Sequence, residues 1–120
     1  MLEEKLEMQT LAKIVVMAGV LVSATSVSAG HFEDGNSLLD HCRGHTYTEK
    51  MLCIGYIEGA FDMFQQWRIQ LDKDSCPTGI IEKQVEDTVI SALTRHPAGR
   101  NDNAALIILS AILIEWHCDF

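Results

Sequence analysis

Four cysteines are the residues of this 120-residue chain best suited to chemistry: Cys42, Cys53, Cys76 and Cys118. Their spacing contains no C-x-x-C pair, the arrangement typical of redox-active thiols. An even number of cysteines in a small exported domain more often forms structural disulfides. We therefore predict two disulfides, provided that the chain is exported.

A second group with possible chemistry is His41, Cys42 and His45, which lie close together in the sequence. A zinc site usually has four ligands, and this segment offers three. Cys42 is also better explained as half of a disulfide. We expect neither a metal ion nor a cofactor.

Two carboxylates, Glu58 and Asp62, are four residues apart and would share one face of a helix. Such a pair can transfer protons or bind a cation, but it is far more often a solvated acidic face. The chain has no G-x-S-x-G, no H-E-x-x-H and no phosphate-binding glycine loop. We therefore expect no catalytic residues and no enzyme activity.

The N-terminus indicates export. Residues 11–22 are mostly apolar, and small residues follow up to Ala29, as in a signal peptide with its cleavage site. The apolar stretch is shorter than the about 20 residues of a membrane-spanning helix. We predict a signal peptide at residues 1–29 and one domain at 30–120, in the oxidising periplasm of a bacterium. Because three acidic residues precede Met8, we expect Met8 to be the true start.

The charge of residues 30–120 is strongly negative, with 7 basic and 14 acidic residues and a net charge of −7. This balance argues against binding to nucleic acid or to anionic lipid surfaces. It favours a soluble protein that meets a basic partner. A domain of 91 residues has a small core, so disulfides would contribute much of its stability.

The elements that position these residues are predicted to be helices, because apolar residues recur at steps of three and four. The expected helices span residues 37–42, 49–71, 81–96 and 104–114. Asp34 or Asn36 caps the first helix and Gly44 ends it. Thr46 and Glu49 have the spacing of a capping box before the second helix. We predict an all-α fold, a compact bundle of four or five helices.

The second and fourth helices have distinctive patterns. The expected buried stripe of the second helix is Cys53, Ile57, Ala60, Phe61, Phe64, Trp67 and Leu71. Gly55 and Gly59 lie on a neighbouring face, where they would let another backbone approach. The fourth helix is apolar on all sides, which predicts a central, buried position, with Asn101 or Asp102 as its N-cap.

The order of the helices suggests how the cysteines pair. In an up-and-down bundle, the end of the first helix meets the start of the second. The start of the third helix and the end of the fourth lie together at the other pole. Of the three possible connectivities, we favour Cys42–Cys53 with Cys76–Cys118.

An ordered set of short motifs resembles the Rap/Tai family of type VI secretion immunity proteins. The motifs are Phe32-x-x-Gly35-Asn36-x-Leu38-Leu39-x-x-Cys42, Cys53-x-Gly55-Tyr56-Ile57-x-Gly59-x-x-Asp62, Cys76-Pro77, Gln84, His96-Pro97-x-x-Arg100 and Cys118. The resemblance covers nearly all of residues 30–120. It implies a small helical periplasmic protein, often a homodimer, that inhibits a toxic effector, typically a peptidoglycan amidase.

An inhibitor of this kind places a rigid protrusion in a cleft of its target, so that little ordering entropy is lost. The best candidate protrusion is the loop at residues 97–103. Its partner-binding candidates are Pro97, Arg100, Asn101, Asp102 and Asn103. The alternative role of the loop is a plain turn between helices, with Arg100 bound to a helix C-terminus.

Two other functions fit the same composition. A periplasmic acid-stress chaperone of the HdeA type would expose apolar surface when its carboxylates protonate. An orphan exported helical module with an unrelated partner is also possible, since a fold does not determine a function. The order of the motifs favours the immunity function.

Overall fold

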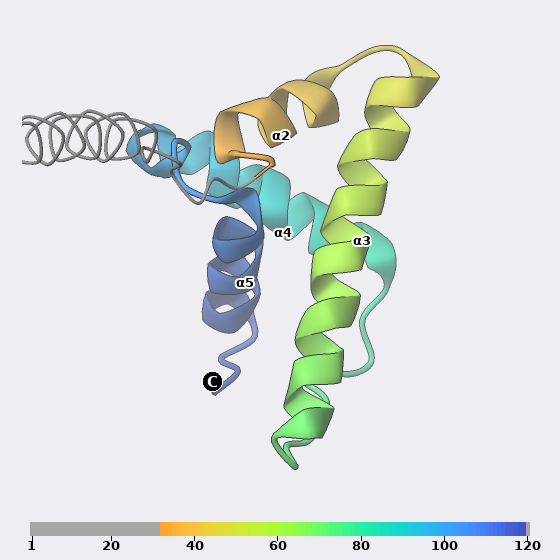
Figure 1. The fold of residues 1–120 in the computed structure, drawn as a ribbon, viewed down its shortest axis with the longest axis vertical. Coiled ribbons are helices and arrows are strands. Elements are labelled where there is room, and N and C mark those ends of the chain that lie inside the picture. The colour runs from red at the N-terminus through yellow and green to blue at the C-terminus, as the bar shows by residue number, and fades with distance from the viewer. Residues whose placement is uncertain (1–31, 120) are drawn as a thin grey trace, which may run out of the picture. The chain divides into compact units, whose positions relative to one another are not determined.

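The computed structural model describes residues 32–119, which fold into α-helices joined by short connections (Figure 1). The elements are α2 (Gly35–Arg43), α3 (Tyr47–Gln70), α4 (Glu82–Arg95), the 3-10 turn η1 (Pro97–Gly99) and α5 (Ala104–Glu115). The predicted all-α fold is confirmed. Within the described residues, no helix is long and apolar enough to span a membrane. The predicted signal peptide and the start at Met8 lie outside those residues and stay predictions.

Local capping explains where α2 and α3 begin. The Asp34 carboxylate accepts a hydrogen bond from the Ser37 backbone N–H at 2.8 Å, and Gly44 is the C-cap of α2. The predicted capping box of α3 is present, because Thr46 Oγ1 accepts from the Glu49 N–H and Glu49 Oε2 accepts from the Thr46 N–H, both at 3.1 Å. The bond from the Thr46 N–H to the Glu49 carboxylate is the largest cause of the lowered pKa of Glu49. Polar residues at the predicted positions therefore determine both helix starts.

The prediction for the start of α5 was wrong. Asn103, rather than Asn101 or Asp102, is the N-cap, and its side-chain oxygen accepts from the Ala105 N–H at 2.8 Å. Asn101 and Asp102 still belong to the turn that follows η1. The Asp102 carbonyl accepts a hydrogen bond from the Gly35 N–H, and α5 begins after this residue.

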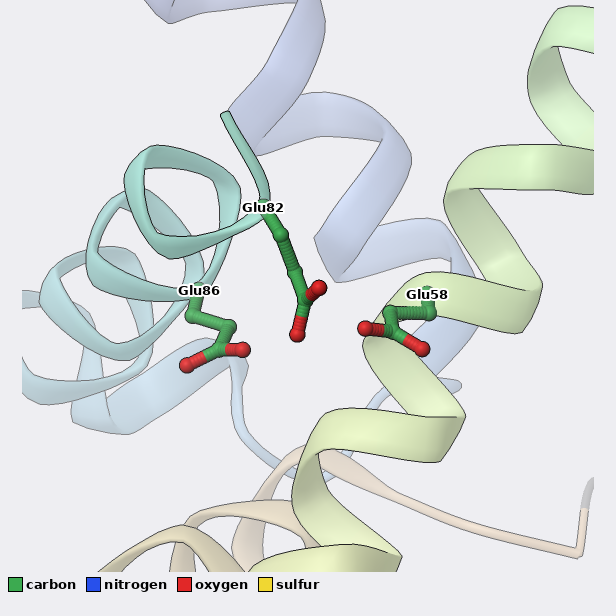
Figure 2. Close-up of side chains that lie close together, drawn as sticks. All are labelled: Glu58, Glu82 and Glu86. Atoms are coloured by element: carbon green, nitrogen blue, oxygen red, sulfur yellow. The ribbon is translucent and has the colours of Figure 1, made fainter. Parts of the chain in front are cut away.

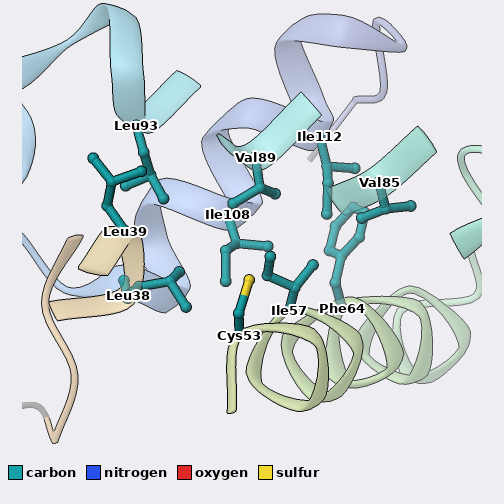
Figure 3. Close-up of a cluster of buried hydrophobic side chains, with 11 residues drawn as sticks. Leu38, Leu39, Cys53, Ile57, Phe64, Val85, Val89, Leu93, Ile108 and Ile112 are labelled. Atoms are coloured by element: carbon teal, nitrogen blue, oxygen red, sulfur yellow. The ribbon is translucent and has the colours of Figure 1, made fainter. Parts of the chain in front are cut away.

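The core contains side chains from α2, α3, α4 and α5 (Figure 3). Its buried members are Leu38, Leu39, Cys53, Ile57, Phe64, Val85, Val89, Leu93, Ala104, Ile108 and Ile112. Of the predicted buried stripe of α3, Cys53, Ile57 and Phe64 are buried, and Ala60 and Phe61 are partly buried against the core. The prediction was wrong at its end, where Trp67 and Leu71 are more than half exposed. Arg68 is buried instead, because backbone carbonyls of the neighbouring segments accept its hydrogen bonds.

The helix that is apolar on all sides, α5, is only partly buried. Ile108 and Ile112 face the core and are inaccessible, whereas Leu106 and Ile114 are 60% and 74% exposed. The expectation of a fully buried helix was therefore wrong, because the other helices cover one side of α5 and leave the opposite side open.

Two disulfides connect the elements. Cys42–Cys53 joins α2 to the first half of α3, with a Cα–Cα distance of 4.9 Å. Cys76–Cys118 joins the loop between α3 and α4 to the segment after α5, with a Cα–Cα distance of 5.9 Å. Each bond restricts the unfolded chain and so stabilises the fold.

Candidate functional site

The loop at residues 97–103 is fixed by the backbone of the segment that begins α2. The Gly35 N–H donates to the Asp102 carbonyl at 3.1 Å, and the Asn36 N–H donates to the Arg100 carbonyl at 3.0 Å. A Cβ on Gly35 would come within 2.9 Å of the Arg100 carbonyl oxygen, so this close approach requires glycine. These two backbone hydrogen bonds fix the loop against the start of α2.

Arg100 is engaged within the fold. Its Nε donates to the Leu93 carbonyl at 2.7 Å and its Nη2 to the Thr94 carbonyl at 3.3 Å. These carbonyls lie in the last turn of α4, where the helix leaves acceptors without partners and where a positive charge is favourable. The geometry matches the second role considered above, that of a side chain bound to a helix C-terminus.

The other residues of the loop differ in how accessible they are. Asn103 is occupied as the cap of α5, and Asn101 Oδ1 accepts from Asn36 Nδ2 at 3.0 Å. Pro97, Asn101 and Asp102 are exposed. Of the five predicted partner-binding residues, these three present accessible atoms, while Arg100 and Asn103 mainly stabilise the loop.

A groove of about 950 Å³ lies beside the loop, between α4 and α5. The exposed Leu106 and Ile114 line it together with Ala111. Toward the loop its rim carries Arg95, and toward the far end of α5 it carries Glu115. The groove can therefore take an apolar segment that continues from a contact with the loop.

A separate acidic cluster forms where α4 begins (Figure 2). Glu58 of α3 and Glu82 and Glu86 of α4 have carboxylate oxygens that all lie within 4.8 Å of one another. The pKa of Glu58 is raised, chiefly by a hydrogen bond with Glu82. The pKa of Glu86 is raised by burial and then by Glu82. Of the predicted pair Glu58 and Asp62, Glu58 thus interacts mainly with carboxylates of another helix, which sequence spacing could not reveal.

The end of α3 holds a polar clamp that the sequence analysis missed. Gln65 Nε2 donates to the Cys76 carbonyl at 2.7 Å, and the Cys76 N–H donates to Gln65 Oε1 at 3.2 Å. Arg68 donates to the carbonyls of Asp74 and Asp119, and its Nη2 also pairs with the Asp119 carboxylate at 3.1 Å. The guanidinium holds the pKa of Asp119 below its usual value. The clamp fixes both segments that the Cys76–Cys118 bond joins.

The three residues considered as metal ligands do not form a set. Cys42 is bonded to Cys53 and has no free thiolate. His41 Nε2 lies 3.6 Å from Glu33 Oε1, an ion pair when the imidazole is protonated. His45 is exposed in the connection before α3.

These features define a small all-α protein held by two disulfides, with a rigid loop exposed between its last two helices. Residues 34–118 match the family described as Rap1a immunity proteins, and the chain belongs to that family. The match includes α2, α3, α4, α5 and all four cysteines, and it confirms the predicted Rap/Tai relationship. Comparisons with curated proteins and with solved structures find no match.

Proposed function

We propose that this protein is a periplasmic immunity protein that binds and inhibits a type VI-secreted effector, a peptidoglycan amidase or a related cell-wall hydrolase. The observation that carries the proposal is the family match over residues 34–118. Two disulfides, which persist in an oxidising compartment, support an exported protein. The protein acts by binding its target and performs no catalysis of its own.

The loop at residues 97–103 is the proposed inhibitory element. Because its backbone is fixed by α2, binding would cost little conformational entropy, which favours affinity. Pro97, Asn101 and Asp102 are its exposed contact residues, and the adjacent α4–α5 groove would receive an apolar segment of the effector. Arg100 contributes indirectly by holding the loop against α4.

A homodimer is a further part of the proposal. Gly55 and Gly59 lie on the solvent side of α3, and a Cβ on either would meet nothing within 4 Å in the described part of the chain. Leu52 and Met63, on the same side of this helix, are half or more exposed. A second copy could cover this strip of α3 without blocking the loop.

The first experiment is capture of the effector with the tagged, oxidised protein, followed by a hydrolysis assay on isolated peptidoglycan. A purified cell-wall hydrolase that the protein inhibits stoichiometrically would establish the function. Capture of no hydrolase, or of one that stays active in the complex, would reject it.

Variants then test the loop. Asp102→Lys should weaken inhibition about 10- to 100-fold, the usual range for a central interface residue. Asp74→Lys, an equal change of charge at an exposed residue of the loop between α3 and α4, is the matched control. Arg100→Met should instead lower the melting temperature, because the last turn of α4 loses its donor. Equal inhibition by the native protein and Asp102→Lys would exclude this part of the loop from the interface.

A further inference from the structure

A second crevice, of about 310 Å³, lies between α3 and the start of α4, at the end of α4 remote from the loop at 97–103. Its deeper lining is apolar, since Ile57, Pro77 and Val85 are buried residues. Glu58, Asp62 and Glu82 also line it and are wholly or partly exposed, so carboxylates border its opening. The crevice therefore combines apolar walls with a negatively charged rim.

The carboxylates at this rim form no salt bridge within the described residues. None of the four ion pairs formed within residues 32–119 includes Glu58, Asp62 or Glu82, which line the crevice, and none includes Glu86, whose carboxylate lies beside that of Glu82. The nearest cation in sequence, Lys83, is paired with Asp87. The carboxylates of Glu58, Glu82 and Glu86 converge in Figure 2. The pKa of Glu58 is raised chiefly by its hydrogen bond with Glu82, and the pKa of Glu86 is raised by burial and then by Glu82.

Exposed acidic groups often gather without binding anything, so the cluster alone identifies no ligand. The crevice beside the cluster limits which ligand can bind there. A divalent cation would complete its six or more oxygen ligands with water, because the apolar walls supply none, and it would leave those walls unused. A lysine or arginine side chain has an apolar stem that fits such walls and a cationic head that fits the rim.

We propose that this crevice binds a lysine or arginine side chain presented by a partner protein. The acidic charge of the chain favours the approach of such a basic partner. Where the proposed function holds, the effector supplies this side chain and contacts the protein at a second place besides the loop. The crevice itself is defined by the described residues and can be tested without the effector.

The probe is a capped tetralysine peptide, with the same peptide carrying acetylated side chains as the uncharged control. Binding to the full, oxidised protein is followed by amide chemical shifts in NMR. We expect the charged peptide to shift amides around Ile57, Gly79 and Glu82, and the acetylated peptide to leave them unchanged. Added salt should weaken the effect, because the attraction is screened.

Two variants separate a specific crevice from general attraction between charges. Glu82→Gln should weaken the peptide about tenfold, the usual effect of losing one charge-assisted hydrogen bond. Glu115→Gln removes the same charge from the end of α5 and should bind as the native protein does. Unchanged spectra of both variants without peptide would show that the fold is intact.

Three results would overturn the inference. The first is no shift in the crevice at any peptide concentration. The second is an equal loss of affinity in both variants, which would reveal only general attraction. The third is a Ca²⁺ ion that shifts the same amides while the peptide does not, which would replace the side-chain site by a metal site. A positive peptide result with no hydrolase captured would reject the proposed function alone.

Discussion

Removing the Arg68 guanidinium should strongly destabilise the protein. Arg68 is 5% exposed, and it connects the end of α3 to two segments through the carbonyls of Asp74 and Asp119. Its guanidinium also lies 5.7 Å from the centre of the Phe64 ring. Arg68→Met keeps most of the apolar stem and removes every donor.

The size of the effect follows from these contacts. A hydrogen bond from a charged donor contributes about 1.5 to 3 kcal/mol. We take the lower value for each of the two carbonyls, because Asp74 and Asp119 are exposed residues and water can replace the lost donor. The Asp119 carboxylate is 77% exposed, so its ion pair adds little. The expected loss is about 3 kcal/mol, which for a domain of this size lowers the melting temperature by about 12–24 °C.

Thermal unfolding of the oxidised protein, followed by circular dichroism, measures this change. Asp119→Asn is the matched control, since it keeps the Asp119 carbonyl and removes only the exposed charge, and its midpoint should fall by a few degrees at most. A fall of less than about 4 °C for Arg68→Met would refute the reasoning. It would mean that the free energy needed to desolvate the buried guanidinium is as large as the free energy gained from its hydrogen bonds.

Three further predictions concern other parts of the chain. Gly55→Ala and Gly59→Ala should each stabilise α3 by about 1 kcal/mol, because a new Cβ at either position meets no atom of residues 32–119 within 4 Å. A lower melting temperature together with loss of a dimer would show that a second copy needs this space. Glu86→Gln should raise the melting temperature at pH 7 and have no effect near pH 4. The raised pKa values of Glu58 and Glu86 mean that stability is complete below their ordinary pKa and is lost as the pH rises through the raised values; an equal gain at both pH values would contradict this sign. Replacing Cys76 and Cys118 by serine should lower the free energy of unfolding by about 4 kcal/mol, and replacing Cys42 and Cys53 by about 3 kcal/mol, since the Cys76–Cys118 bond closes the longer loop. Urea unfolding of both variants tests this order.

The helices could be predicted because their signals are local. The capping box of Thr46 and Glu49, the cap at Asp34 and the stop at Gly44 act within a few residues of the helix ends they define. The order of the helices also places the cysteines at two poles, and the two bonds of the structure join the pairs that this order favours. Apolar periodicity then identifies the core side of α3 and α4.

The features that could not be predicted depend on which elements meet. Trp67 and Arg68 both follow the buried stripe of α3, and hydrophobicity alone favours burying the tryptophan. Arg68 is buried instead, because the backbone carbonyls of Asp74 and Asp119 accept its hydrogen bonds. In α5, nearly every residue is apolar, so the pattern cannot indicate which side stays open.

The candidate site was predictable in part. The sequence indicated an exposed loop between two helices, and Pro97, Asn101 and Asp102 are accessible. It left open whether the Arg100 side chain contacts a partner or is bonded within the protein, since that depends on how near the last turn of α4 lies. The meeting of Glu58 with Glu82 and Glu86 required the packing of α3 against α4.

The bond between Cys76 and Cys118 makes a covalent ring of the chain between them, and that ring contains α4, α5 and the loop at 97–103. A protease that cuts once inside this ring opens it without releasing a fragment. The two pieces stay attached, and the core contacts of α4 and α5 still hold them in register. The exposed loop can therefore be cut once without the molecule falling apart, a useful property for a protein whose loop is proposed to meet an enzyme.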